Sequence, residues 1–279
     1  MAEMTADAPR VPDPARGAEI VGVVLAAGAG TRLRPLTRLR PKAMCPVANR
    51  PLVDWALERA GTAGLGRVAV NVHHGRQSLE SHLHRIRIHD AGSTAPLLGV
   101  PLHVSVEHRE ALGTAGALGR LRSWIDGAGT LVLNADAWSP GSLADFVAGW
   151  DRERVRLLVV GSDRLEPSSR IAAALMPWTE VSALDAVPSG LYEASWEAAA
   201  ADGRVEVVRH HGPFVDCGTP SQYLEANLQA SGGVSVVEPG ARVEGTLEEC
   251  VLWADAVVRP GEHLVRAIRL AGSFTVLVR

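Results

Sequence analysis

The sequence predicts an α/β protein built on a doubly wound, mostly parallel sheet, followed by a small C-terminal element of another kind. Over residues 20–163, short aliphatic runs alternate with helical patterns, which is typical of successive βαβ units. The first aliphatic run ends in a turn with Gly28 and Gly30, where backbone N–H groups can close around an anion because no side chain is in the way. From Val234 onward aliphatic residues recur six apart, so the βαβ pattern stops there.

The expected elements of the first part follow from hydrophobic periodicity. We expect strands at residues 21–27, 67–72, 102–106, 129–133, 156–163 and 204–208. We expect helices that begin near Pro51, after Gly75 and at Thr114, and a last helix at residues 220–230 with Thr219 as its N-cap. Residues 168–197 mix alanine, proline and tryptophan, and no element can be placed there.

The C-terminal pattern consists of three aliphatic pairs, each six residues apart and separated by glycine turns: Val237 and Val243, Val251 and Val257, Leu264 and Leu270. This spacing predicts a short left-handed parallel β-helix of about two coils, in which each face contributes one six-residue repeat. The alternative is an irregular β-meander, because the steps between the pairs are eight and seven residues. We therefore expect a disordered segment at 1–18, the main domain at 19–230 and the β-helix tail at 231–279.

Composition excludes several classes of function. The net charge of −3 gives no general attraction for nucleic acid or an anionic membrane. No apolar run approaches the roughly 18 residues of a membrane span, and no basic segment followed by an apolar core marks a secretory signal. We expect a cytoplasmic protein. Cys45, Cys217 and Cys250 are odd in number and widely spaced, so we expect buried small hydrophobic residues instead of disulfides or a zinc site.

Lys42 is the single lysine among 28 basic residues. A coding bias toward arginine explains the depletion, but an ammonium and a guanidinium are not interchangeable in a tight phosphate site. Lys42 is therefore expected to be functional, with chance survival of a surface lysine as the alternative.

The glycine turn does not match the two commonest nucleotide-binding motifs. A dinucleotide fingerprint requires a third glycine at position 33, where this chain has Leu33, and a Walker loop requires Gly-Lys-Ser/Thr, which does not occur. What remains is a phosphate loop that continues into a basic segment made of Arg32, Arg34, Arg38, Arg40 and Lys42. Prolines interrupt this segment and no aromatic residues are interleaved, which argues against duplex binding. A solvated run of charges is the other interpretation.

Residues 25–57, LAAGAGTRLRPLTRLRPKAMCPVANRPLVDWAL, resemble the signature of nucleoside-diphosphate-sugar pyrophosphorylases, the sugar-1-phosphate nucleotidyltransferases. Three further segments resemble that family in the same order: LGTAGAL at 112–118, LNAD at 133–136 and FVDCGTPSQYLEAN at 214–227. The resemblance covers about residues 20–230 and is greatest to mannose-1-phosphate guanylyltransferase-like members. It implies a Rossmann-like doubly wound mixed sheet, and the tail resembles the β-helix of several members.

The resemblance also implies a reaction and its residues. An oxygen of a sugar 1-phosphate attacks the α-phosphorus of a nucleoside triphosphate, and pyrophosphate leaves. Arg32 would stabilise the triphosphate and Lys42 the two reacting phosphates, while Asp136 and Asp216 would bind Mg2+. Backbone and side chains around the nucleotide would come from Leu25, Ala26, Ala27, Gly28, Gly30, Thr31, Gly113 and Thr114. For Asp136 alone, a helix cap is the alternative role.

The sugar half departs from the family pattern. Asn134-Ala-Asp136 stands where Asn-Gly-Asp is usual, and the family's Glu-Lys-Pro element cannot exist in a chain with one lysine. Arg170 is expected to serve the sugar phosphate instead, and Gly190-Leu191-Tyr192 resembles a strand of the sugar pocket. The expected sugar-phosphate pocket is thus Asn134, Arg170, Gly190 and Tyr192.

The base is expected to be guanine, because LGTAGAL with the preceding Glu107 and Glu110 resembles guanylyltransferase members most. A carboxylate there, such as that of Glu107, could accept the N1 and N2 hydrogens of guanine. GTP is thus favoured over UTP or dTTP. Two other functions stay open: a catalytically weak regulatory paralogue that binds nucleotide, and transfer to a non-sugar acceptor such as a cyclitol phosphate or phosphocholine. Exposed edges of a β-helix also suggest a homo-oligomer.

Overall fold

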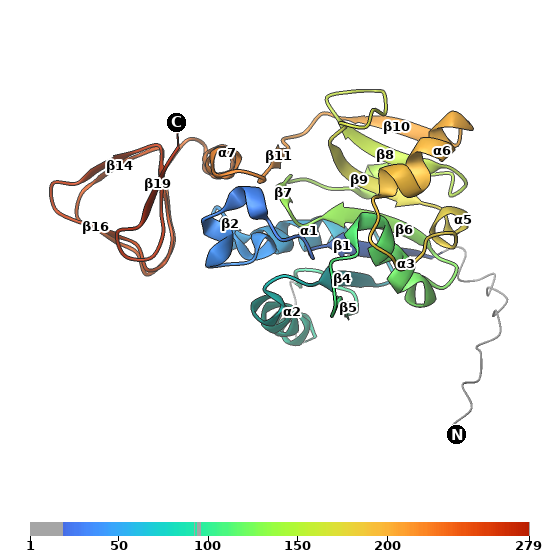
Figure 1. Cartoon of the computed structure of the whole chain (residues 1–279), viewed down its shortest axis with the longest axis horizontal. Coiled ribbons are helices and arrows are strands. Elements are labelled where there is room, and N and C mark those ends of the chain that lie inside the picture. The colour runs from blue at the N-terminus through green and yellow to red at the C-terminus, as the bar shows by residue number, and fades with distance from the viewer. Residues whose placement is uncertain (1–18, 92, 94–95, 279) are drawn as a thin grey trace, which may run out of the picture.

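The computed structural model describes residues 19–91, 93 and 96–278, so the segment expected to be disordered, 1–18, lies outside the described residues. Its centre is a seven-stranded sheet in the order β10-β8-β9-β6-β1-β4-β5 (Figure 1). The strands are β1 Ile20–Leu25, β4 Val68–Val72, β5 Leu102–Val106, β6 Gly129–Asn134, β8 Val155–Val160, β9 Ile171–Met176 and β10 Val205–His210. The helices are α1 Leu52–Gly61, α2 Arg76–Asp90, α3 Gly113–Ile125, α4 Ala144–Ala148, α5 Trp178–Val181, α6 Glu197–Ala201 and α7 Pro220–Ser231.

The sheet is mixed because β9 runs antiparallel to both of its neighbours, β6 and β8, while the other neighbouring pairs are parallel. All six expected strands are present in it. Strand β9 was not predicted, since its sequence IAAALM is rich in alanine and periodicity does not separate a short buried strand from a buried helix. The helix starting after Thr219 is confirmed with its cap, because the Thr219 hydroxyl accepts the N–H of Gln222.

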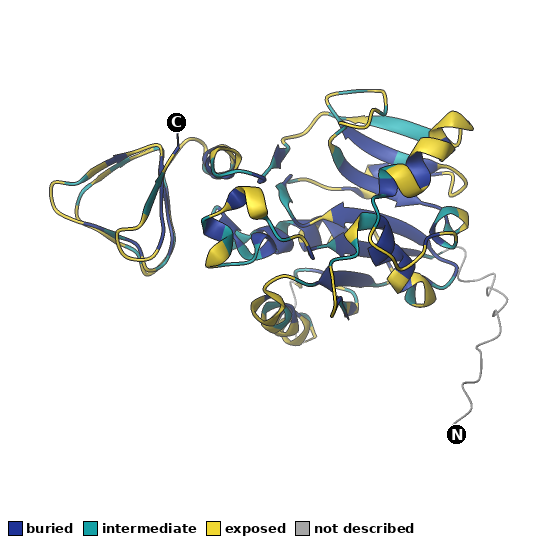
Figure 2. Cartoon of the chain, in the orientation of Figure 1, coloured by how far each residue is buried: buried dark blue, intermediate teal, exposed yellow. Residues whose placement is uncertain are grey.

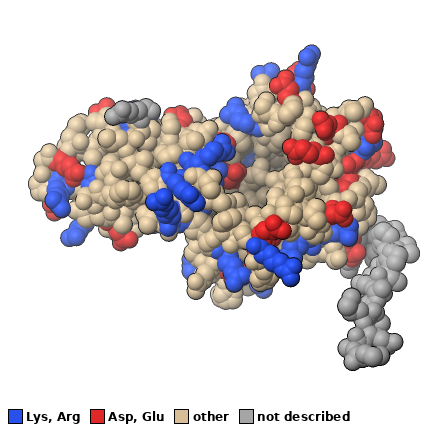
Figure 3. All heavy atoms as spheres, viewed as in Figure 1, with Lys and Arg blue, Asp and Glu red and all other residues tan. Residues whose placement is uncertain are grey.

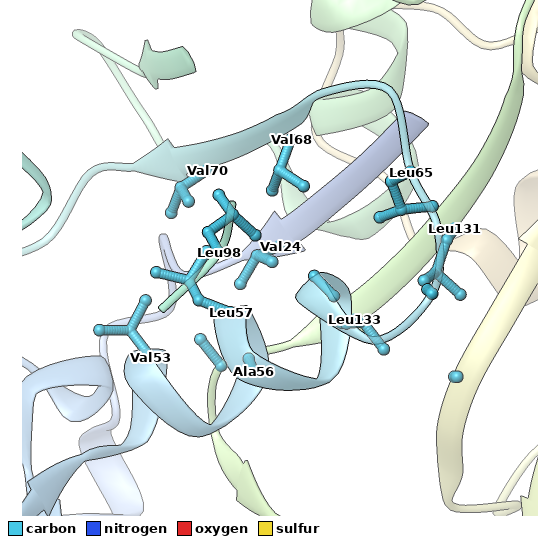
Figure 4. Close-up of a cluster of buried hydrophobic side chains, with 14 of the residues drawn as sticks. Val24, Val53, Ala56, Leu57, Leu65, Val68, Val70, Leu98, Leu131 and Leu133 are labelled. Carbon is cyan, nitrogen blue, oxygen red and sulfur yellow. The ribbon is translucent and has the colours of Figure 1, made fainter. Parts of the chain in front are cut away.

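Helices cover both faces of the sheet, and alternate residues of each strand point to opposite faces. Val24 and Val70 pack with α1, α2 and α4 on one face, where Figure 4 shows them next to Leu57. Val23 and Ala69 pack with α3 and α5 on the other face. Figure 2 shows the central strands as the buried interior of this layered arrangement. The doubly wound fold class predicted from the sequence is therefore correct.

The basic segment after the glycine turn is compact instead of extended. It forms three short 3-10 turns, η2 Thr31–Leu33, η3 Leu36–Arg38 and η4 Lys42–Met44, and a small antiparallel pair of β2 Pro46–Val47 with β3 Arg50–Pro51. Its apolar side chains, among them Leu33, Leu36 and Cys45, belong to a third buried cluster that also contains α7 and residues of the tail.

The tail is a three-sided coil at the end of the molecule away from α5 and α6 (Figure 1). Its strands are β12 Val236–Val237, β13 Arg242–Val243, β14 Thr246–Glu248, β15 Val251–Leu252, β16 Val257–Val258, β17 His263–Val265, β18 Ala267–Arg269 and β19 Thr275–Leu277. Strands of successive coils pair in parallel on each side, β12-β15-β18, β13-β16 and β14-β17, and only β19 pairs antiparallel. Parallel pairing rules out the β-meander, and the handedness of the coil stays a prediction.

The interior positions of the tail match the six-residue pairs only in part, since Val251, Leu264 and Leu270 are buried. Val236 stacks on Val251 and Ile268, whereas Val237 and Val243 are 36% and 39% exposed. The reason is the coil length. The stacked positions are 251 − 236 = 15 and 268 − 251 = 17 residues apart, while three full six-residue repeats would require 18. A spacing of six therefore holds within parts of the tail but does not give its register.

Within the described residues, no helix has the length and apolar character needed to span a membrane.

Candidate active site

A cavity of about 340 Å³ opens at the carboxyl ends of β1, β4 and β6, where the loops that follow parallel strands meet. Twelve of the residues expected from the sequence line it: Leu25, Ala26, Ala27, Gly28, Gly30, Thr31, Arg32, Lys42, Gly113, Thr114, Asn134 and Asp136. The structure adds Ala29, Ala43, Asn71, Ala111, Ala135 and Gly218. The glycine turn and the segments near 113 and 134 are therefore parts of one site.

The glycine turn is held against the lysine that follows it. Gly30 has φ of +60°, and a Cβ on it would lie 2.8 Å from Thr37 Cγ2 and 3.0 Å from Lys42 Cβ. The Thr37 hydroxyl donates a hydrogen bond of 2.9 Å to the Gly30 carbonyl. Only a residue without a side chain fits both the left-handed backbone and this close approach. The turn and Lys42 consequently form one wall of the cavity.

The basic segment divides between two hollows. Arg32 and Lys42 face the cavity described above, whereas Arg34, Arg38 and Arg40 line a neighbouring hollow of about 1060 Å³ that shares Ala29 and Thr31 with it. Figure 3 shows basic side chains gathered on the face between the tail and the sheet. The solvated-run interpretation thus fails for Lys42, which is 7% exposed.

Lys42 lies between the two aspartates. Its Nζ is 2.9 Å from Asp136 Oδ2 and 3.4 Å from Asp216 Oδ1. Two short strands bring the carboxylates together, because β7 Ala137–Trp138 pairs with β11 Val215–Asp216 in antiparallel register. Asp136 does not cap a helix, since the next helix, α4, has Leu143 at its N-cap. The structure therefore brings the lone lysine and both predicted metal ligands to one point.

The donor set at this point suits Mg2+. No group of three or more His, Cys, Asp or Glu side chains placed to hold a metal occurs in the described ranges. Mg2+ commonly uses one or two carboxylates and takes its other ligands from water and substrate phosphates. Asp136 and Asp216 supply such a pair near the glycine turn, so the residues fit an ion that would be bound jointly with a phosphorylated substrate.

Glu107 does not reach the cavity as a base-reading group. It is 2% exposed, and its two carboxylate oxygens accept hydrogen bonds from Asn71 Nδ2 at 2.7 Å and from the Leu112 N–H at 2.9 Å. Asn71 in turn accepts the N–H of Ala26 at 2.7 Å through Oδ1. Glu107 and Asn71 therefore connect the glycine turn with the turn before α3. Asn71 was missed, although an asparagine inside the apolar run RVAVNV is a usable signal.

Gly113 begins α3 in a left-handed conformation with φ of +71°, and a Cβ there would clash with the Ser189 carbonyl oxygen. Thr114 Oγ1 accepts the N–H of Leu191 at 2.8 Å. The segment 189–191 thus supports the start of α3 from behind.

Three of the four expected sugar-pocket residues lie outside the cavity lining. The strand expected at Gly190-Leu191-Tyr192 is wrong. Gly190 lies in a loop, and a π-helix spans Tyr192–Trp196 and continues into α6. Arg170 precedes β9, with its guanidinium 6.0 Å from the ring centre of Phe214. Asn134 alone of this group lines the cavity. The three-residue likeness at 190–192 does not predict the structure, because the helix-forming alanines of α6 follow it.

The chain is similar to known proteins over most of its length. Residues 21–169, more than half of the 279, match the family model described as nucleotidyl transferase. The chain belongs to the nucleotidyl transferase family. It is 30% identical to N-acetylmuramate alpha-1-phosphate uridylyltransferase of Caulobacter vibrioides over 239 residues, 75% of this chain and 96% of that relative. It is 26% identical to mannose-1-phosphate guanylyltransferase of Mycobacterium tuberculosis, over 88% of this chain and 74% of the relative.

Solved structures agree with the fold of this nucleotidyl transferase. UDP-glucose pyrophosphorylase complexed with UDP-glucose has a TM-score of 0.61 and 17% identity, covering 77% of this chain and 99% of that structure. A putative glucose-1-phosphate thymidylyltransferase from Bacillus anthracis gives 0.60 at 17% identity, covering 76% and 95%. At these identities the likeness establishes the Rossmann-like fold with its mixed sheet, and nothing finer.

The three cysteines are expected to be inert. Cys45, Cys217 and Cys250 are free and buried, as the sequence predicts. Burial raises the pKa of Cys45 to about 12, although the charges of Arg40 and Lys42 partly offset the shift. Burial also raises the pKa values of Cys217 and Cys250. At pH 8 the Cys45 thiol is therefore almost entirely protonated.

We expect iodoacetamide at pH 8 to leave all three thiols of the native transferase unmodified within an hour and to modify all three in denaturant. Because the pKa of Cys45 is raised, its thiol stays protonated until the pH approaches that value. Intact-protein mass measures the number of labels. Rapid single labelling of Cys45 or Cys217 in the native protein would show that the buried environment is wrong.

Proposed function

We propose that this nucleotidyl transferase transfers a nucleoside monophosphate from a nucleoside triphosphate to a sugar 1-phosphate. A phosphate oxygen of the sugar 1-phosphate attacks the α-phosphorus, the bond from that phosphorus to the oxygen leading to the β-phosphorus breaks, and pyrophosphate leaves. The products are a nucleoside-diphosphate sugar and pyrophosphate. The observation that carries this proposal is the placement of Lys42 between Asp136 and Asp216 on the wall of a cavity that also contains the glycine turn.

Each residue has a role that needs no covalent intermediate. Backbone N–H groups of the Gly28 to Gly30 turn hold phosphate oxygens, and Arg32 neutralises the triphosphate and the departing pyrophosphate through its forked donors. Lys42 places a compact positive charge at the two reacting phosphates, which stabilises the charge that develops there. Mg2+ held by Asp136 and Asp216 would supply further charge neutralisation and in-line orientation. Catalysis then arises from positioning and electrostatics.

The structure gives less support to guanine as the base than the sequence does. The argument for guanine depended on Glu107, whose carboxylate is occupied by Asn71 and Leu112. The relatives above are named for both uridylyl and guanylyl transfer. We therefore propose UTP or GTP as the nucleotide donor, and only the likeness of LGTAGAL to guanylyltransferase members favours GTP.

The decisive experiment is a matrix of four nucleoside triphosphates against a panel of acceptors with Mg2+, measured by release of pyrophosphate. The panel contains glucose, mannose and N-acetylmuramate 1-phosphates, together with a cyclitol phosphate and phosphocholine. We expect release that requires both a nucleotide and a sugar 1-phosphate. Pyrophosphate release with only the cyclitol phosphate or phosphocholine would show that the acceptor is not a sugar 1-phosphate. Nucleotide binding without any release would favour the regulatory paralogue.

We further propose that the tail is a left-handed β-helix attached to a domain at 19–230 and that its exposed edges pack in a cytoplasmic homo-oligomer. Val265 and Leu277 of the tail are 41% and 66% exposed, which supports a contact at this end. Light scattering on the purified chain tests the assembly, and a monomer at micromolar concentration would contradict it.

A further inference from the structure

The tail contacts the segment that carries the lone lysine through a two-pronged ion pair. Arg40 Nη1 lies 2.8 Å from Glu238 Oε1, and Arg40 Nη2 lies 3.0 Å from Glu238 Oε2. Both side chains are largely buried, at 29% and 18% exposure. A parallel pair of charge-assisted hydrogen bonds fixes the orientation of the guanidinium as well as its position. Arg40 is two residues before Lys42, so this contact restrains the backbone immediately next to it.

Two more groups of the tail complete the seat of the guanidinium. The ring of Trp253 lies 4.5 Å from Arg40 Cζ, in cation–π geometry. Glu238 Oε2 also accepts the N–H of Ala254 at 2.8 Å, which holds the carboxylate itself in place. Glu238 follows β12 and Trp253 follows β15, so two stacked coils of the tail together hold the Arg40 guanidinium.

The other end of the lysine-bearing segment is tied to the tail as well. Asn49 Nδ2 donates to the Val237 carbonyl at 2.9 Å. Between these ties, Cys45 and Val47 pack in the same buried cluster as Trp253. The Tyr223 hydroxyl donates to the Pro46 carbonyl and accepts from Trp253 Nε1, which lies 3.1 Å away. The segment 40–49 is thus attached to the tail at both ends and in the middle.

The tail nevertheless contributes no residue to the lining of the active-site cavity, whose described lining ends at Gly218. Its contacts therefore act on the chemistry only by way of the 40–49 segment. The geometry that this segment must keep is narrow, because Nζ of Lys42 is within 3.4 Å of two carboxylates at once. A displacement of about 1 Å at such a site can cost roughly a hundredfold in rate.

We propose that Glu238 and Trp253 of the C-terminal coil are positioning residues, which hold Arg40 so that Lys42 stays between Asp136 and Asp216. This inference rests on the proposed function for its kinetic consequence, but the restraint on Lys42 does not depend on the substrate. The tail would then be required for full activity, because it holds the segment that carries Lys42.

The test compares Glu238→Gln with the matched control Glu249→Gln. Glutamine keeps the size of Glu238 but removes its charge and turns one acceptor into a donor, so at least one of the two hydrogen bonds from Arg40 is lost. Glu249 forms an exposed ion pair with Arg266 in the same tail, away from the 40–49 segment. We expect Glu238→Gln to lower kcat about tenfold with KM for the nucleotide within about twofold, and Glu249→Gln to change neither.

A second measurement needs no knowledge of the substrate. Lys42 is the only lysine in the chain, so acylation of a lysine ε-amine, mapped by peptide mass spectrometry, reports on this position alone. We expect Glu238→Gln to raise the rate of Lys42 acylation at least threefold, while Glu249→Gln leaves it unchanged. If the protein did not catalyse the proposed reaction, kcat could not be measured, but the acylation rate of Lys42 would still test the restraint.

A double variant distinguishes positioning through Arg40 from a general loss of stability, because the effects of the two substitutions should not add. If Glu238 acts through Arg40, the double variant Arg40→Gln/Glu238→Gln has about the kcat and acylation rate of Glu238→Gln alone. An unchanged acylation rate in Glu238→Gln would overturn the proposal. So would a loss of activity that only follows the unfolded fraction in thermal melts of the same variant.

Discussion

Replacement of Lys42 by alanine is expected to lower kcat about a thousandfold and to change the melting temperature by only a few degrees. Nζ of Lys42 is the buried positive charge at the meeting point of Asp136 and Asp216, and loss of one preorganised donor at developing charge typically costs 10²–10³ in rate. The folded state is affected less, because the side chains of Asp136 and Asp216 are 49% and 30% exposed and water screens their repulsion.

The measurement is pyrophosphate release under saturating substrates, with thermal unfolding as the control for folding. Lys42→Arg is the informative companion. It keeps the charge but places a planar fork in a site where Lys42 Cβ and Cγ already lie against Gly30, so we expect a loss of at least tenfold. Turnover of Lys42→Ala within about threefold of the parent would contradict the assigned role.

Asp216→Asn is expected to lower activity about a hundredfold at physiological Mg2+ and to raise the Mg2+ concentration required for half-maximal rate. An amide oxygen is a weaker ligand for a hard cation than a carboxylate, and Asp136 alone would remain as the charged ligand. Activity measured across a Mg2+ titration gives both quantities, and partial recovery at high Mg2+ is part of the expected result.

Asp202→Asn provides the matched control, because Asp202 is an exposed aspartate that pairs with Arg204, whereas Asp216 pairs with Lys42. It should leave the Mg2+ dependence unchanged. If Asp216→Asn had the same Mg2+ dependence as the parent, the pair of aspartates would not be the metal site, and Asp216 would serve only to orient Lys42.

Much of the fold could be predicted because local periodicity records it. The valine-rich strands and the capped helix after Thr219 alternate or repeat in ways that depend on neighbours along the chain. Strand β9 and the helix starting at Tyr192 could not, since alanine-rich sequence suits either state and tertiary contacts decide between them. The register of the tail could not be predicted for another reason, because coil length depends on the turns between strands.

The sequence by itself predicted a phosphate-binding role for the glycine turn and singled out Lys42, because spacing within twenty residues and the uniqueness of that lysine are visible along the chain. Only the tertiary structure decided which distant groups meet that turn. Asp216 joins Asp136 because β11 pairs with β7, Glu107 is turned inward by Asn71, and Glu238 reaches Arg40 from 198 positions away. Such contacts depend on the path of the chain through space, which residue spacing does not encode.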